Sequence, residues 1–381
     1  ICLRSRGEVI VSLIAKEALR PSRLASDAFD ELKLLSPFLM VVGLYIVAVT
    51  GIAQFTGLVP YLRLTLYTEA LWLSLSVGLP AGLIIYFFYL MFWEREKRPL
   101  ARAARDLTTY VLAPRVVTEL VVSLLAISYF VSAFSSFKVM IGTLNPFFLD
   151  PLLARLDALI HFGIQPWKIT HFVFRGFAGT MALNFAYNFW FFLMWIFVFC
   201  QLLALAGRRE RARYLLSFVL CWTVIGSVLA FLLSSAGPCY YGRVTGLPDP
   251  YAPLMHLLNA MDAPHVASGS YWHLWSLTTQ QQLWSDQFLS TTSIGAGISA
   301  MPSMHVSMAY LLAFSSYRIN KWLGRIMLAY AVIISIGSID LGWHYAVDGY
   351  VSIAITYLLW RLSGAIIDRI ESNLQKNFLP V

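Results

Sequence analysis

Apolar runs alternate with short polar segments along most of this chain. There are eight such runs, and most are close to the ~20 residues that an α-helix needs to cross a membrane. They lie at 37–57, 69–92, 116–136, 182–206, 214–235, 302–317, 324–340 and 344–363. The pattern predicts an all-α polytopic membrane protein with about eight transmembrane helices.

These runs divide the chain into four parts. Residues 1–35 carry mixed charge with apolar positions at rough helical spacing, which predicts a cytoplasmic interfacial segment. Residues 36–115 should form two additional N-terminal transmembrane helices and a basic loop. Residues 116–363 should form a six-helix membrane core, and residues 364–381 a cytoplasmic tail.

Composition and charge support this interpretation. The hydrophobic fraction is 59% and the charged fraction 13%, against roughly 45–50% and 25% in soluble domains. Of the 28 Lys and Arg residues, 22 fall in the termini and in alternate connections, which places both termini in the cytoplasm by the positive-inside rule. The other six are Arg63, Lys138, Arg155, Lys168, Arg175 and Arg243.

The basic residues and the cysteines give no indication of a nucleic-acid or metal partner. Because the basic residues follow membrane topology, the net charge of +8 gives no indication of nucleic-acid binding. The four cysteines show neither metal-ligand spacing nor a disulfide framework, so we expect no metal and no cofactor. Nothing in the sequence indicates a protein partner.

Two long segments should face the periplasm, the cell exterior or an organelle lumen. Residues 137–181 are too polar to span, and the stripe there that includes Leu153 and Leu156 predicts an interfacial helix with Arg155 and Asp157 on its opposite face. Residues 236–301 are rich in Trp, Tyr, Ser, Thr and Gln. A connection of about 65 residues is longer than a link between helices requires, which is typical of a functional segment.

The candidate chemistry lies at the start of two late spans. Met301-Pro302-Ser303-Met304-His305 opens one, and Gly342-Trp343-His344-Tyr345-Ala346-Val347-Asp348-Gly349 opens another. His344 and Asp348 are four residues apart and share one helix face, so the carboxylate can hold one ring nitrogen. His305 comes 39 residues earlier, about one span down and one span back, so both histidines should reach the outward side.

Two histidines with one carboxylate partner are suited to attack on phosphorus. One imidazole attacks and becomes phosphorylated, while the other protonates the leaving oxygen and the carboxylate stabilises the charge on the nucleophile. The helix start at Pro302-Ser303 offers free backbone N–H groups and the positive end of the helix dipole to a phosphate.

The sequence P-S-M-H, followed later by H-Y-A-V-D, resembles the second and third motifs of the type 2 phosphatidic acid phosphatase superfamily. The resemblance implies that His344 is the nucleophile, His305 the general acid, Asp348 the orienting carboxylate and Ser303 a phosphate ligand. The six spans between 116 and 363 resemble that family's core.

Two departures point to one branch of the family. The first motif, a Lys followed at a distance by Arg-Pro, is not recognisable, and the stretch Gly237–Arg243 takes its place; six residues before His344 stands Ser338 instead of Arg. The chain is most similar to the inositol phosphorylceramide synthase branch. The likeness rests on these two departures, on the sequence G-W-H-Y-A-V-D-G and on the segment around Asp157. The additional candidates for substrate binding are therefore Arg243, Tyr240, Tyr241, Asn188 and Asp157. For Asn188, part of a polar strip near the outer end of its span, interhelical hydrogen bonding remains an equal alternative.

The predicted function is transfer of a phosphorylated headgroup from a phospholipid donor to a lipid alcohol acceptor. The first alternative is hydrolysis, by a lipid phosphate or polyprenyl diphosphate phosphatase. The second is a transporter whose outward vestibule is lined by the histidines, although such a protein would be expected to carry charged or broken helices near the middle of the membrane.

Overall fold

A computed structural model describes residues 24–108, 114–202, 207–289, 292 and 294–376, and these residues form helices and connections without a strand. Six helical stretches among them are long and apolar enough to cross a membrane. The helices that contain them are α2 (Leu24–Phe55), α5 (Pro114–Leu144), α8 (Gly176–Leu202), α9 (Arg208–Thr223) with η4 (Val224–Leu229) and α10 (Ala230–Leu232), α15 (Lys321–Asp340), and α16 (Ala346–Lys376). The prediction of an all-α polytopic membrane protein is confirmed.

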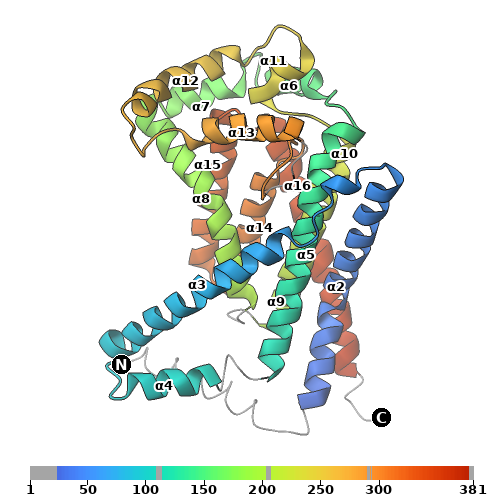
Figure 1. The fold of residues 1–381 in the computed structure, drawn as a ribbon, viewed down its shortest axis with the longest axis vertical. Coiled ribbons are helices and arrows are strands. Elements are labelled where there is room, and N and C mark those ends of the chain that lie inside the picture. The colour runs from blue at the N-terminus through green and yellow to red at the C-terminus, as the bar shows by residue number, and fades with distance from the viewer. Residues whose placement is uncertain (1–23, 109–113, 203–206, 290–291, 293, 377–381) are drawn as a thin grey trace.

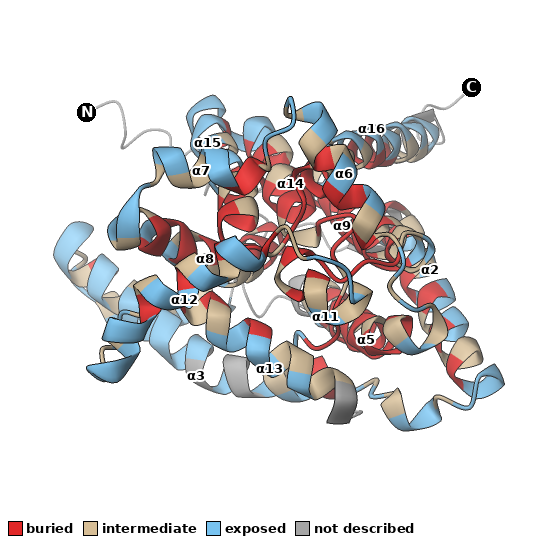
Figure 2. Ribbon diagram, turned by 90° about the horizontal axis from the view of Figure 1, so that it is seen from above, coloured by how far each residue is buried: buried red, intermediate tan, exposed pale blue. Residues whose placement is uncertain are grey.

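The two remaining expected spans are not among these six stretches. The run 69–92 corresponds to α3 (Leu66–Phe88) and the π-helical η2 (Tyr89–Trp93), and the run 302–317 to α14 (Met304–Ile319), which has 16 residues. Most of α14 is buried at the centre of the bundle, as Figure 2 shows. Since neighbouring helices rather than lipid surround it, α14 does not have to match the thickness of the hydrocarbon core.

Three boundaries differ from those expected. The helix α2 begins at Leu24 and runs unbroken, so residues 24–35 extend the first spanning helix, while residues 1–23 lie outside the described part of the chain. The helix α16 likewise continues to Lys376 through most of the expected tail. The helix α5 runs to Leu144, eight residues past its expected end, and this places Lys138 in a membrane helix instead of an outward loop.

The short helices gather at the two ends of the bundle. Figure 1 shows α4 (Pro99–Asp106) at one end with the start of α2 and the end of α16. Five helices form a cap over the other end: α6 (Asp150–Ile160), α7 (Pro166–Val173), α11 (Tyr241–Thr245), α12 (Ala252–Ala267) and α13 (Trp275–Leu289). The two expected outward segments therefore meet in one cap.

Small and polar residues let the central helices approach closely. The hydroxyls of Ser307 in α14 and Thr356 in α16 are 2.7 Å apart, and both side chains are fully buried. At the other end of α14, the Asn320 side chain accepts hydrogen bonds from the backbone N–H groups of Trp322 and Leu323 and so caps α15. Close packing and hydroxyl pairs of this kind hold helices together in lipid, where the hydrophobic effect contributes little.

A second apolar core joins the cap to the bundle. Leu153 of α6, Leu254 and Leu258 of α12, and the residues Met301 and Tyr345 beside the two histidine motifs are buried in one cluster. The position of the cap and the position of the motifs are therefore coupled.

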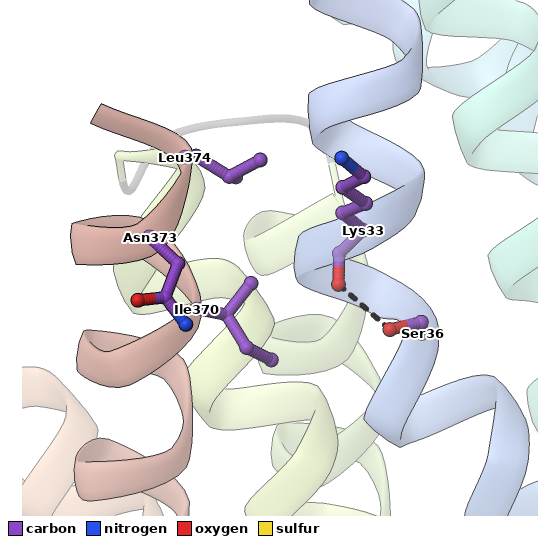
Figure 3. Close-up of a pocket in the computed structure, with 5 residues that line it drawn as sticks. All are labelled: Lys33, Ser36, Ile370, Asn373 and Leu374. Carbon is purple, nitrogen blue, oxygen red and sulfur yellow. Dashed lines mark hydrogen bonds between the residues drawn. The ribbon is translucent and has the colours of Figure 1, made fainter. Parts of the chain in front are cut away.

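A small pocket lies at the opposite end of the molecule. Lys33 and Ser36 of α2 face Ile370, Asn373 and Leu374 of α16 across it (Figure 3). Because it lies near the start of α2 and the end of α16, it is separate from the histidine motifs.

Candidate active site

The two histidines meet beneath the cap. His305 lies in the first turn of α14, and His344 lies in the turn that joins α15 to α16. Their ring centroids are 5.9 Å apart, with an angle of 58° between the ring planes. The 39-residue spacing thus brings both rings together at one end of the bundle (Figure 1).

The tautomer of His344 follows from its neighbours. Its Nδ1 lies 2.9 Å from the carbonyl oxygen of Ala300 and 3.4 Å from Oδ2 of Asp348. Both of these oxygens accept hydrogen bonds, so Nδ1 carries the hydrogen. In the neutral ring Nε2 then has a free lone pair, which is what a nucleophile requires.

Burial keeps this ring neutral. The side chain of His344 is only 6% exposed. Burial lowers the pKa of His344 to about 3, the hydrogen bond to the carbonyl of Ala300 opposes this change, and the positive charge of Lys138 lowers the pKa further. At neutral pH the ring is therefore in the form that can attack phosphorus.

Asp348 supports the His344 turn in two ways. It is fully buried in the first turn of α16, and its Oδ2 accepts a hydrogen bond of 3.0 Å from the backbone N–H of Tyr345. The same oxygen faces Nδ1 of His344, while Oδ1 has no partner among the described residues. The carboxylate is thus placed to stabilise positive charge on His344 when the ring becomes phosphorylated.

His305 lies between aromatic rings. Its ring stacks on Tyr187 at a centroid distance of 4.5 Å and contacts Trp190 at 4.4 Å, both from α8. No hydrogen bond from the His305 ring to another described residue fixes its tautomer. Stacking therefore orients this ring and leaves both nitrogens available for proton transfer.

Ser303 begins α14. It is fully buried, and its hydroxyl accepts a hydrogen bond of 3.4 Å from the backbone N–H of Val306. This N-cap fixes the first turn of α14, which carries His305. The resemblance assigns Ser303 to phosphate binding, which remains a prediction.

Two buried carboxylates of α6 hold the backbone around the histidines. Asp157 accepts hydrogen bonds from the N–H groups of Ala346 and Val347, at 2.8 and 3.0 Å, and so caps α16 from another helix. Asp157, which we expected on the face opposite the apolar stripe, is only 2% exposed. Its role in substrate binding remains a prediction. Asp150, two turns earlier, accepts hydrogen bonds from the Tyr345 hydroxyl and from the N–H of Gly237. Asp157 therefore holds the backbone after His344, and Asp150 holds the Tyr345 side chain and the backbone at Gly237. No pattern in the sequence identified Asp150 as part of this arrangement.

The stretch Gly237–Arg243 packs directly behind the site. The φ of Gly237 is +102°, and a Cβ there would come within 2.7 Å of the carbonyl oxygen of Trp343, so glycine is required. The buried hydroxyl of Tyr240 donates to the carbonyl of Gln280, and Tyr241 packs in the core beneath the cap. Arg243 is exposed and donates to the side chain of Gln281. These three candidates therefore contact the cap, while the backbone of their segment contacts the site.

Asn188 and Ser338 make hydrogen bonds that hold the helices and the turn around His344 in place. Asn188 donates hydrogen bonds to Asn184 and, at 3.5 Å, to the hydroxyl of Ser276 in α13, which is the interhelical alternative. Ser338 is buried, and its carbonyl accepts hydrogen bonds from the backbone N–H groups of Trp343 and His344. The described residues include no group of three or more His, Cys, Asp or Glu side chains placed to share a metal ion.

Comparison with known proteins gives one match. The family model of the PAP2 superfamily matches residues 151–362, a little more than half of the chain, and this range includes the cap, both histidines and Asp348. The helices α2 to α5 lie outside it. No curated protein and no solved structure matches the chain.

Proposed function

This chain belongs to the PAP2 superfamily, and on that basis we propose that it transfers a phosphorylated headgroup from a phospholipid to a lipid alcohol through a phosphohistidine at His344. Members of the superfamily are generally phosphatases or phosphotransferases, which favours an enzyme over a transporter. The observation that carries the proposal is the buried His344 ring, with Nδ1 held by Ala300 and Nε2 free, 5.9 Å from His305.

The reaction takes two steps. Nε2 of His344 attacks the donor phosphorus, the bond from phosphorus to the oxygen of the departing lipid alcohol breaks, and His305 gives that oxygen a proton. An acceptor hydroxyl then gives its proton to His305 and attacks the phosphorus, and the bond to Nε2 breaks. A bound phosphate next to His305 favours the protonated ring that the first step needs.

Exclusion of water is the reason for preferring transfer. Water that reached the phosphohistidine would hydrolyse it, so transfer requires a closed site in which an acceptor hydroxyl is held near phosphorus. The cap supplies such a cover through its shared core with Met301 and Tyr345, and His344 is 6% exposed. The likeness to the inositol phosphorylceramide synthase branch makes a ceramide-type lipid alcohol the first acceptor to test.

We expect purified protein given a phosphorus-labelled phospholipid donor and a lipid alcohol to form a new labelled lipid. Product analysis by thin-layer chromatography and mass spectrometry, with and without the acceptor, measures this. The matched control is the same assay without acceptor, in which labelled headgroup phosphate should appear only slowly. If water-soluble phosphate or phospho-headgroup stays the sole product across a range of acceptors, the protein is a hydrolase and the proposed transfer is wrong.

The proposal also requires the cap to face away from the cytoplasm. A cysteine introduced at the exposed Ser268, in the cap, should react with a membrane-impermeant maleimide added to intact cells or sealed vesicles of cell-surface orientation. A cysteine at the exposed Lys321, the first residue of α15, should react only after permeabilisation. The wild-type chain, with its own cysteines, sets the background. Labelling of both positions from the outside would overturn the orientation, and an intracellular membrane would be indicated by protection of both until the vesicles are opened.

A further inference from the structure

A groove runs between α2 and the helix formed by α9, η4 and α10. Its volume is about 520 Å³, and it is lined by residues within 41–52 of α2, by residues within 220–232 of the facing helix, and by Phe137 of α5. The lining residues Leu44 and Val228 are 64% and 49% exposed, whereas Phe137 is 7% exposed. The groove is therefore open along the outside of the bundle and closed by α5 on its inner side.

The lining offers carbon atoms to an occupant. None of the described residues that line the groove is charged, and three of them carry hydroxyls: Tyr45, Thr223 and Ser227. The Tyr45 hydroxyl donates to that of Ser227 at 2.7 Å, since Ser227 gives its own hydrogen to the carbonyl of Trp222. The Thr223 oxygen has no partner among the described residues, but it is buried in the wall and does not face an occupant. Water needs two to four polar partners, so an apolar occupant fits this groove.

The groove is about as long as one leaflet is thick. Residues 41–52 and 220–232 rise by roughly 17 and 18 Å at 1.5 Å per residue, and half of the hydrocarbon core of a bilayer is ~15 Å. Both segments belong to the later halves of the spanning stretches Leu32–Phe55 and Arg208–Leu232. Figure 1 shows the last turns of α2 and α10 at the cap end of the bundle. The groove therefore lies in the leaflet on the cap side.

The volume distinguishes a lipid chain from another helix. A helix ~10 Å in diameter has a cross-section of ~79 Å², so 520 Å³ holds only ~6.6 Å of its length, little more than one turn. The same volume holds roughly 17 groups of the size of a water molecule, which is close to that of a methylene. A single hydrocarbon chain therefore matches the groove in length, volume and chemistry.

We infer that this groove binds one acyl chain of a phospholipid from the cap-side leaflet, at a site separate from the histidines. A packed wall lies between the two sites. In it the rings of Phe134 and Trp222 meet edge to face at 4.5 Å. A Cβ at Gly226 would come within 2.8 Å of Phe134 and 3.0 Å of Sδ of Met304, the residue before His305. The chain in the groove therefore belongs to a resident lipid and not to the reacting one.

The site joins an additional helix to the conserved part of the fold. The helices α2 and α5 lie outside the range that the family model matches, whereas α9, η4 and α10 lie inside it. A chain in the groove contacts both groups of helices. Since a ligand that binds only the folded state stabilises it, the lipid should hold α2 against the core.

A photoreactive lipid tests the site. The probe is phosphatidylcholine with a diazirine at the middle or the end of one acyl chain, mixed into nanodiscs that hold the full chain. Phe137 lies at the closed side of the groove, so lipid around the outside of the bundle does not reach it. Illumination followed by peptide mass spectrometry should show label at Phe137. Label confined to exposed faces of the helices, with none at Phe137, would overturn the inference.

Matched variants test the lining. Ala48→Phe places a ring in the groove from α2, and Val228→Phe does so from the facing helix, so each should lower the label at Phe137 at least tenfold. Val47, next to Ala48, does not line the groove and is 70% exposed, so Val47→Phe should label as the wild type does. Wild-type labelling in both groove variants would contradict the assignment.

Thermal unfolding separates lost binding from misfolding. Phosphatidylcholine added to the detergent-solubilised protein should raise the Tm of the wild type and of Val47→Phe, and should not raise that of Ala48→Phe. Without added lipid, Ala48→Phe should melt at or above the wild-type Tm because its ring fills the groove; if it melts lower, Val228→Phe is the deciding variant. An equal rise in all three proteins would overturn the inference. An unlabelled Phe137 in a dimer that Ala48→Phe dissociates would assign the groove to a second copy of the chain. Neither measurement requires turnover, so both are independent of the proposed function.

Discussion

Replacement of His344 by alanine is expected to abolish the phosphorylated enzyme and to lower turnover by about a million-fold, as when other enzymes lose their nucleophile. The reason is the geometry of one ring: Nδ1 is occupied by the Ala300 carbonyl and faces Asp348, and only Nε2 can attack. Brief incubation with a phosphorus-labelled donor, followed by denaturation in alkali, should trap label on the wild-type chain and none on the variant.

Folding must be separated from chemistry in that experiment. His344→Gln keeps a hydrogen-bond donor that can reach the Ala300 carbonyl, so it should retain the wild-type Tm and still form no phosphoenzyme. His256→Ala, at an exposed position of α12, serves as the matched control and should react normally. Near-normal turnover in His344→Gln would show that another group is the nucleophile.

The sequence predicted the parts of the site that depend on periodicity. Hydropathy predicted the spans, and the 39-residue interval between two span starts predicted that His305 and His344 meet at one end of the bundle. The four-residue interval similarly predicted that Asp348 faces His344, and their side chains are 3.4 Å apart. The family resemblance added roles to these residues, and the superfamily is confirmed by the family model. The roles themselves and the branch remain predictions.

The contacts that the sequence missed come from backbone atoms and from distant helices. The closest partner of Nδ1 in His344 is the backbone carbonyl of Ala300. Every residue has a backbone carbonyl, so the sequence cannot show which one makes this contact. Asp150 accepts a hydrogen bond from the Tyr345 hydroxyl and Asp157 accepts one from the backbone N–H of Ala346, each from about 190 residues away in the sequence. Such pairings are set by how the cap docks on the bundle, which no local pattern encodes.

Helix boundaries failed where a charged residue interrupted an apolar run. Lys138 suggested the end of a span, yet α5 continues to Leu144 because the turn around the lysine packs against protein instead of lipid. The same misplacement concealed a cation whose charge lowers the pKa of His344. A lysine near the end of a predicted span is therefore better treated as a candidate site residue than as a boundary.

Replacement of His305 by alanine should slow the first chemical step by about 10²–10⁴-fold, the usual contribution of a general acid. The effect should depend on the leaving group, because an oxygen of low pKa can leave without a proton. With a donor in which p-nitrophenol replaces the lipid alcohol, the rate of phosphoenzyme formation in His305→Ala should come within about tenfold of the wild-type rate. Rapid-quench measurement of the labelled enzyme with both donors gives the two ratios.

Trp190, which contacts the His305 ring, provides a control. Trp190→Phe keeps an aromatic contact to this ring and should slow the reaction of both donors equally. An equal loss for both donors in His305→Ala would mean that His305 positions the substrate and does not protonate the leaving group.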